Sequence, residues 1–173
     1  MTDKQENILK TALELFANHG FNAISTNKIA KEANVSEGLI FRHFGSKKGL
    51  LEAILNQAYE QAAVLYSHII SEDDPKKAIR HTITLPFRLE ESEYHFWKLQ
   101  FKLKWELEIS SQDKVQPLLD KMAWAFEALN YQNPYKEAHV LQHIVESILA
   151  GILKDGIETQ ISLKEFLLDK YQV

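Results

Sequence analysis

A short helical segment, residues 36–44, carries the side chains whose types and spacing are most suggestive of chemistry. At about 100° per residue, Ile40 and Phe44 share one face, which must pack inward. Gly38 and Arg42 lie on the opposite side, four residues apart on one outward ridge. A glycine inside a helix costs roughly 1 kcal/mol relative to alanine. Its presence on this ridge therefore indicates the close approach of another surface.

The composition of the ridge suits the edge of a base pair. Leu39 and Phe41 flank it, where a helix that faces only solvent would carry more charge. The guanidinium of Arg42 can donate two hydrogen bonds to a guanine edge. Two short helices joined by a tight turn, the second with an exposed ridge, form a helix-turn-helix, whose second helix enters the DNA major groove. Arg42 is therefore a candidate base-reading residue.

Two lysines follow in the first turn of the next predicted helix. Lys47 and Lys48 oppose the helix dipole at this position. A DNA phosphate bound there would remove the conflict, because backbone N–H groups and both lysines would face the same anion. The alternative is a solvated helix start, and the residues alone leave both interpretations open.

A second pattern could bind a metal. His139 and His143 are four residues apart, with Glu146 three residues further on, and this spacing can bind zinc. No glutamate of the H-E-x-x-H type lies between the histidines, so metalloprotease chemistry is unsupported. Polar residues at the edge of an apolar stripe are the favoured interpretation. Because the sequence also lacks a phosphate loop, nucleophile motif and dinucleotide fingerprint, we expect no enzyme activity, no metal and no cofactor.

Apolar periodicity and turn residues predict helices along the whole chain, and so an all-α fold. The first helix, residues 3–19, would be capped by Asp3 with Glu6 and would end at Gly20. A long helix over residues 46–71, about 40 Å at 1.5 Å per residue, would lead from the candidate DNA-contacting segment into the C-terminal half. The other helices are expected at residues 25–33, 36–44, 75–90, 97–109, 113–130, 134–155 and 162–172.

One of these segments, residues 97–109, has the periodicity of a strand. Large apolar residues alternate with polar ones, at Trp97, Leu99, Phe101, Leu103, Trp105, Leu107 and Ile109. No other segment alternates in this way, and a lone strand would leave its backbone groups without partners. We therefore predict a helix here, and its apolar residues on all sides require burial on several sides.

Composition narrows the class of protein. The net charge of −4 is uneven: residues 1–50 carry seven Lys/Arg and five Asp/Glu, or +2, and residues 51–173 carry thirteen and nineteen, or −6. The basic excess coincides with the candidate DNA motif. The 173 residues include no cysteine, so disulfides and thiolate metal sites are excluded. Without a signal-peptide h-region or an apolar run of about 20 residues, we expect a soluble, cytoplasmic protein that does not contact membranes.

The candidate DNA-binding segment resembles the DNA-binding domain of the TetR family of bacterial transcriptional regulators. The matching residues are His19-Gly20-Phe21, Thr26, Ile29-Ala30, Val35-Ser36, Gly38, Phe41, His43-Phe44 and Lys47. The resemblance covers residues 5–55, about a third of the chain. It implies that bases are read by Gly38, Leu39 and Arg42, and Glu37 beside them is a further candidate for base reading. It also implies that phosphates are held by Thr26, Lys28, Ser36, Phe41, His43, Lys47 and Lys48.

Two positions depart from the family pattern. The family usually has a tyrosine where this chain has Phe41, so the hydroxyl that would reach a phosphate is missing and the ring remains. Glu37 is unusual at a DNA surface. As the first residue of its helix it suits the helix dipole, which is the favoured interpretation. The alternative is that it accepts a hydrogen bond from a cytosine amino group.

The resemblance implies two domains, a helix-turn-helix domain at residues 1–48 and a helical effector-binding and dimerisation domain at residues 49–173. The chain would then be a ligand-responsive repressor that binds a near-palindromic double-stranded operator as a homodimer. The dimer interface is expected at Leu141, Ile144, Val145, Ile148, Leu149, Gly151, Ile152 and Phe166. A pocket for a small apolar or aromatic effector is expected at Phe87, Trp97, Phe101, Trp105, Trp124 and Phe126. The alternatives are that these aromatic residues are plain core, and that the scaffold is an effector-independent DNA-binding or protein-interaction module.

Overall fold

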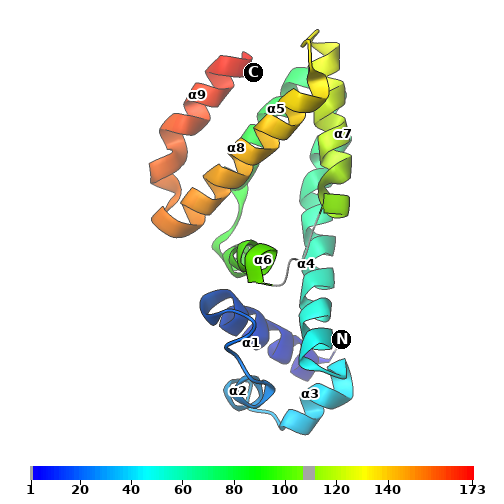
Figure 1. Ribbon diagram of the computed structural model, residues 1–173, viewed down its shortest axis with the longest axis vertical. Coiled ribbons are helices and arrows are strands. Elements are labelled where there is room, and N and C mark those ends of the chain that lie inside the picture. Colours follow the sequence, from blue (N-terminus) through cyan, green and yellow to red (C-terminus); the bar gives the residue numbers. More distant parts are fainter. Residues whose placement is uncertain (1, 107–111) are drawn as a thin grey trace. The chain divides into compact units, whose positions relative to one another are not determined.

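The computed structural model describes residues 2–106 and 112–173, and within these residues all regular secondary structure is helical. Figure 1 follows the helices from α1 in blue to α9 in red. They are α1 (Asp3–His19), α2 (Thr26–Glu32), α3 (Glu37–Phe44), α4 (Lys47–Ile70), α5 (Pro75–Thr84), α6 (Tyr94–Glu106), α7 (Gln112–Ala128), α8 (Pro134–Asp155) and α9 (Ile161–Tyr171), with 3-10 turns η1 (Leu85–Arg88), η2 (Glu91–Glu93) and η3 (Ile157–Gln160). The all-α prediction is confirmed. None of the described helices is long and apolar enough to cross a membrane.

The chain divides into two compact units. The first contains α1, α2, α3, α6 and the part of α4 up to Gln61, and the second contains the rest of α4 together with α5, α7, α8 and α9. This division by packing differs from the boundary expected after residue 48, because the first half of α4 and the whole of α6 share a core with α1. The domain boundary after residue 48 was placed at the end of the predicted DNA-binding motif, and it stays a prediction.

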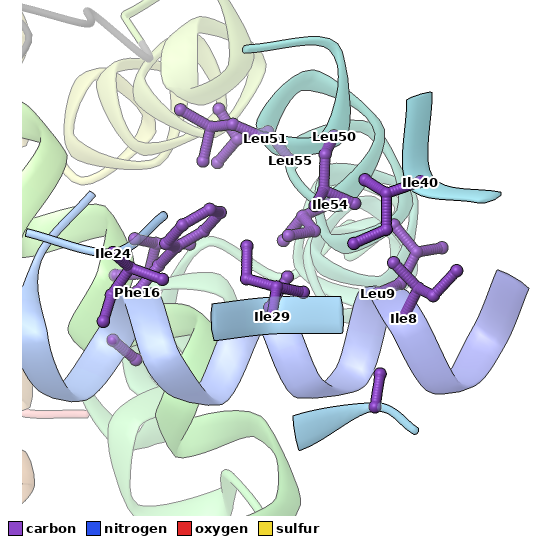
Figure 2. Packing of buried hydrophobic residues seen from close by; sticks show 14 of the residues in the cluster. Ile8, Leu9, Phe16, Ile24, Ile29, Ile40, Leu50, Leu51, Ile54 and Leu55 are labelled. Carbon is purple, nitrogen blue, oxygen red and sulfur yellow. The ribbon is translucent and has the colours of Figure 1, made fainter. Parts of the chain in front are cut away.

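The core of the first unit lies where α1 to α4 converge (Figure 2). Its residues are buried and aliphatic or aromatic, and those labelled in the figure are Ile8, Leu9, Phe16, Ile24, Ile29, Ile40, Leu50, Leu51, Ile54 and Leu55. Burial of one such side chain contributes about 1.5–3 kcal/mol. Ile40 is the buried residue of α3. Its insertion into this core fixes which face of α3 points outward.

The segment with strand-like alternation is helical, as predicted. In α6, Phe96, Leu99 and Leu103 are buried in the first unit's core at helical spacing. Trp97 and Phe101 on other faces are half-buried, and Lys102 Nζ donates a hydrogen bond to the carbonyl of Asn18 at 2.8 Å. Packing against α1 thus supplies the burial that the alternating pattern requires. Leu107 and Ile109 lie outside the described residues.

The cap of α1 differs from the prediction. Thr2, and not Asp3, is the N-cap, and its Oγ1 accepts the Gln5 N–H at 3.4 Å. In return, the Oε1 atom of Gln5 accepts the Thr2 N–H at 2.9 Å, which completes a capping box. The predicted stop is confirmed, since Gly20 has φ +87° and its N–H donates to Phe16 O at 2.8 Å.

The second unit is built around α7 and α8, which run side by side (Figure 1), with α5 packed against α7 and α9. Its interior contains an aromatic cluster. Phe126 is fully buried, and its ring centroid lies 4.9 Å from that of Tyr131 and 5.5 Å from that of Tyr171. The cluster joins α7 to α9 within this unit.

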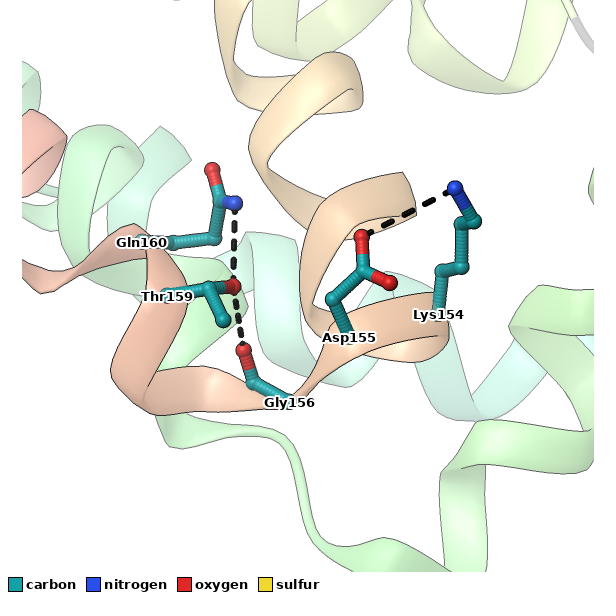
Figure 3. A network of polar contacts seen from close by, with 5 residues as sticks. All are labelled: Lys154, Asp155, Gly156, Thr159 and Gln160. Carbon is teal, nitrogen blue, oxygen red and sulfur yellow. Dashed lines mark hydrogen bonds and ion pairs between the residues drawn. The ribbon is translucent and has the colours of Figure 1, made fainter.

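α8 ends at Asp155, as the predicted range 134–155 required, and Gly156 follows as its C-cap. Figure 3 shows the turn, in which Gly156 has φ +92° and its carbonyl accepts a hydrogen bond from Thr159 Oγ1 at 2.7 Å. Gln160 Nε2 donates in turn to Thr159 Oγ1 at 3.1 Å. The left-handed φ at Gly156 suits a residue without a Cβ, so the chain reverses here into η3 and α9.

Candidate nucleic-acid interface

The turn between α2 and α3 has the predicted form. Ser25 is the N-cap of α2, and its Oγ accepts the Lys28 N–H at 3.2 Å. Asn34 takes a left-handed conformation with φ +53°, and Val35 N–H donates to Ala30 O at 2.9 Å. Asparagine tolerates this conformation better than most residues. The tight turn therefore fixes α3 relative to α2.

The outward ridge of α3 is open. A Cβ added to Gly38 would meet no atom of the described chain within 4 Å. Arg42 is exposed, and it has no hydrogen bond or ion pair within residues 2–106 and 112–173. The fold itself therefore gives no reason for the glycine, whose cost in a helix must be offset elsewhere. An unpaired guanidinium beside a glycine can approach a base edge closely.

The two apolar residues that flank this ridge differ in exposure. Leu39 is half-buried and packs against the first unit's core. Phe41 is 46% exposed, although the sequence predicted both residues as flanks of the same outward surface. The exposed apolar area beside Arg42 therefore comes chiefly from Phe41.

Two predicted DNA-contact residues bind each other. Thr26 Oγ1 donates a hydrogen bond of 2.6 Å to Glu37 Oε1, which links the first residue of α2 to the first residue of α3. A carboxylate at a helix N-terminus is also stabilised by the helix dipole. Glu37 therefore has a role within the fold that does not depend on a base contact.

A serine directly before a helix is expected to cap it with its hydroxyl. Ser36 occupies the N-cap position of α3, but its side chain makes no capping hydrogen bond, so this expectation is wrong in that detail. The exposed hydroxyl is left available for an external acceptor. The phosphate-binding role of Ser36 stays a prediction.

The cations near the start of α4 have different surroundings. Lys47 Nζ lies 4.2 Å from the ring centroid of Phe21, a cation–π arrangement that holds the ammonium beside the end of α1. Lys48 Nζ lies 3.9 Å from Glu52, a pair so exposed that it contributes little. Ser46 caps the start of α4, since its Oγ accepts the Gly49 N–H at 2.9 Å. Lys28, on α2, is exposed.

The sequence did not predict the residues that hold the candidate DNA-binding surface of α3 and the start of α4 in place. Gln5 Nε2 lies 3.2 Å from Nδ1 of the half-buried His43 ring, and Asn7 Nδ2 donates to the carbonyl of Ala33 at 2.8 Å. A Cβ at Gly49 would overlap the carbonyl oxygen of Phe44, so the start of α4 can approach the end of α3 only with glycine there. The Thr2-x-x-Gln5 capping box was a readable signal, but no local pattern indicates a contact 38 residues away.

Comparison with known proteins identifies the family. A sequence profile for "Bacterial regulatory proteins, tetR family" matches residues 8–54, which include all of α2 and α3. The transcriptional repressor AcnR of Corynebacterium glutamicum is 30% identical over 172 residues, an alignment that covers 98% of this chain and 80% of AcnR. The chain belongs to the TetR family. It is therefore a DNA-binding transcriptional regulator, as the resemblance implied.

Other relatives match over less of their length. The HTH-type transcriptional regulator YuxN of Bacillus subtilis is 37% identical over 86 residues, which are 49% of this chain and 30% of YuxN. The chain likewise covers 30% of YvkB from the same organism. A transcriptional regulator from Saccharomonospora viridis, solved in complex with choline, aligns with a TM-score of 0.79 at 18% identity over 99% of this chain and 97% of that one. At that identity the likeness establishes the TetR fold alone.

The predicted dimer residues of this TetR-family chain have two different environments. Leu141, Ile148, Leu149 and Ile152 are buried within the single chain. Ile144 and Val145 are half-buried, and Phe166 is 60% exposed. A Cβ at Gly151 would lie 2.6 Å from Gln160 Nε2, so this chain's own side chain occupies the space over that glycine. Much of the predicted stripe is thus core, and the surface open to a partner is smaller than the stripe.

The predicted pocket residues fall in both compact units. Trp97 and Phe101 belong to the first unit, and Phe87, Trp124 and Phe126 to the second. On α7, Phe126 is fully buried whereas Trp124 is 38% exposed with Lys121 Nζ 3.7 Å from its ring centroid. Lys164 Nζ lies 4.9 Å from the Phe87 ring centroid. The Trp105 side chain lies outside the described residues, and the pocket as a set stays a prediction.

The histidine pair has a local explanation. The His139 and His143 ring centroids are 6.4 Å apart, and the Tyr135 ring packs edge-on against His139 at 4.8 Å. Among the described residues, no group of three or more His, Cys, Asp or Glu side chains could hold a metal ion. Tyr135 and the two histidines form a polar and aromatic edge of α8.

Proposed function

We propose that this TetR-family regulator is a ligand-responsive repressor that binds a near-palindromic operator as a homodimer. The observation that carries the DNA-binding part is the open ridge of α3, where Gly38 has no neighbour over its Cα and Arg42 is exposed. In this proposal Arg42 reads a base edge while Gly38 lets the helix backbone approach the groove. Leu39 supplies apolar contact, and Glu37 contributes chiefly by holding Thr26.

Phosphate contacts would surround this base-reading ridge and fix its register on the duplex. The proposed residues are Thr26, Lys28, Ser36, Phe41, His43, Lys47 and Lys48. Removing any one of them would lower affinity for all DNA sequences alike, because a phosphate contact carries no sequence information. Phe41 would contribute only its ring to this surface.

The homodimer would form through the exposed sides of α8 and α9. On α8, Val140 is 48% exposed, and Ile144 and Val145, one turn further along, are half-buried. On α9, Phe166 is 60% exposed. Large apolar side chains on a surface favour association. Leu141, Ile148, Leu149 and Ile152 would support this surface from within. Two recognition helices about 34 Å apart then reach successive major grooves, which favours a near-palindromic operator.

An effector would act by preferring the conformation that does not bind DNA. α4 is the proposed connection, because its first turn belongs to the first unit and its last turns to the second. The choline complex of the Saccharomonospora viridis regulator supports a small-molecule site in proteins of this fold. The aromatic residues of the predicted pocket suit a small apolar or aromatic molecule.

The first test is fluorescence anisotropy with DNA from upstream of the chain's own gene. We expect tight binding that prefers this DNA over a scrambled duplex of equal length and weakens steeply with salt. Lys47→Ala should weaken binding to both duplexes and flatten the salt slope. Equal weak binding to both duplexes, followed by failure to enrich any sequence from a random pool, would contradict the operator model.

The effector is testable by intrinsic fluorescence. All three tryptophans of the chain, Trp97, Trp105 and Trp124, belong to the predicted pocket. A compound that releases operator DNA should also change their emission, and Trp97→Phe and Trp124→Phe would assign the change to one unit or the other. Release of DNA without an emission change in any variant would exclude the predicted pocket.

A further inference from the structure

Gln5 is held in one orientation by the start of α1. Its Oε1 atom accepts the backbone N–H of Thr2 at 2.9 Å and the Thr2 hydroxyl at 3.2 Å. An amide oxygen accepts hydrogen bonds and an amide nitrogen only donates them. Because the backbone N–H of Thr2 requires an acceptor, the oxygen must face Thr2. The Nε2 side of the amide therefore faces away from the cap.

The other half of the Gln5 amide faces a histidine on α3. Gln5 Nε2 lies 3.2 Å from Nδ1 of His43 in a half-buried contact between α1 and α3. Nε2 is a donor, so Nδ1 must supply a lone pair. In a neutral imidazole one nitrogen carries the proton and the other accepts. The capping box thus places the proton of His43 on its Nε2.

We propose that Gln5 is a positioning residue that keeps His43 in the Nε2–H form, so that the ring offers a donor to a DNA phosphate. This inference rests on the proposed phosphate contact of His43. The opposite tautomer would direct a lone pair at an anionic oxygen and would repel it. Gln5 contacts no DNA in this scheme. It couples the cap of α1 to the protonation pattern of a side chain on the recognition helix.

The substitution Gln5→Glu separates this role from capping. A glutamate at this position also completes a capping box, because its carboxylate accepts the Thr2 N–H. It cannot donate to His43, so Nδ1 takes a proton instead. Asn7→Ala is the matched control, since Asn7 also joins α1 to another helix, through a 2.8 Å bond to Ala33 O, and does not contact His43.

The tautomer is measured without DNA. Long-range ¹H–¹⁵N correlation spectra of the ¹⁵N-labelled full chain, in alkaline buffer where an ordinary imidazole is neutral, distinguish protonated from unprotonated ring nitrogens. His43→Ala identifies the signal among the seven histidines. We expect an unprotonated Nδ1 in the wild type and in Asn7→Ala, and a protonated Nδ1 in Gln5→Glu. A wild-type Nδ1 that carries the proton, or a tautomer unchanged in Gln5→Glu, would overturn the proposal.

The effect on DNA is measured as a double-mutant cycle on the operator duplex. We expect His43→Ala to weaken binding about tenfold per half-site, the loss of one charge-assisted hydrogen bond. Gln5→Glu should weaken operator binding severalfold when His43 is present and much less in the His43→Ala background. The second background measures the effect of the added negative charge alone. Equal losses in both backgrounds would overturn the coupling. If His43→Ala had no effect on operator binding while Arg42→Ala abolished operator preference, the proposed phosphate contact of His43 would be wrong. The proposed function as an operator-binding regulator would still hold.

Discussion

Two helical glycines, Gly38 in the first turn of α3 and Gly151 within α8, have opposite surroundings. From sequence, both suggested close approach of an outside partner. Around Gly38 the described chain leaves open space, whereas over Gly151 the side chain of Gln160 comes within 2.6 Å of the position that a Cβ would occupy. The first glycine therefore needs an external explanation, and the second is explained by the fold of its own unit.

The same contrast separates the two surfaces on which function depends. On α3 one residue, Ile40, is buried and the ridge is open. On α8 the stripe expected to meet a second subunit is largely buried within the chain. A wide apolar stripe thus indicates burial without saying what covers it. Four predictions test this contrast.

The largest effect should come from substitutions at two residues of the predicted dimer interface, which should behave differently. Ile148 is fully buried, so Ile148→Ala should cost about 2–5 kcal/mol in the free energy of unfolding. Phe166 is 60% exposed, so Phe166→Ser should leave the fold intact and shift the protein toward monomer. Urea melts and sedimentation equilibrium measure the two outcomes. A dimeric Phe166→Ser protein that binds operator normally would place the interface elsewhere.

Substitution of Arg42 should have the next largest effect, on DNA binding and not on the stability of the fold. Arg42→Ala should lose about 1–3 kcal/mol of operator preference per half-site, because a bidentate base contact disappears. Arg42→Lys is the matched control, since it keeps the charge and loses the bidentate geometry. Anisotropy titrations against operator and scrambled duplexes should show that the lysine variant retains non-specific affinity but discriminates poorly. Full discrimination by either variant would remove Arg42 from base reading.

The two glycines should respond differently to alanine. Gly38→Ala should raise stability by about 0.5–1 kcal/mol, through helix propensity, while weakening operator binding. Gly151→Ala should raise the free energy of unfolding by less, because the new Cβ must displace the Gln160 side chain. Adding Gln160→Ala should restore the full increase in stability. Thermal melts of the single and double variants measure these differences. If Gly38→Ala bound operator as tightly as the wild type, close approach at α3 would be wrong.

Tyr171 gives the smallest effect, inside the second unit. Its hydroxyl is buried without a hydrogen-bond partner among the described residues, so Tyr171→Phe should stabilise by up to about 1 kcal/mol near neutral pH. Burial, helped by Glu137 and Tyr131, raises the Tyr171 pKa above 10.0.

The direction of the pH effect follows from that raised pKa. Above about pH 10 the unfolded tyrosine loses its proton while the folded one keeps it, so stability falls as pH rises through the folded pKa. Tyr171→Phe should lack this component of the decline. Parallel urea melts of both proteins from neutral to alkaline pH measure the difference. A constant difference across that range would show that the buried hydroxyl does not titrate differently on folding.

Local chemistry determined much of this protein before any fold was known. Gly20, Gly45 and Gly156 end helices because each takes a positive φ. Pro75 begins α5 behind an Asp74 cap that accepts two backbone N–H groups. The face of α3 that points outward followed from helical spacing around Ile40. These features depend on neighbours within about four residues, and the sequence states those neighbours directly.

Tertiary structure alone decided which distant side chains meet. The Thr26–Glu37 bond, the Gln5–His43 contact and the grouping of α6 with α1 join positions that carry no shared local pattern. The cap of α1 was misplaced by one residue because both Thr2 and Asp3 are good capping residues and only the backbone geometry chooses. The coverage of the α8 stripe was likewise decided by packing, since hydrophobic burial is non-directional and any apolar neighbour satisfies it.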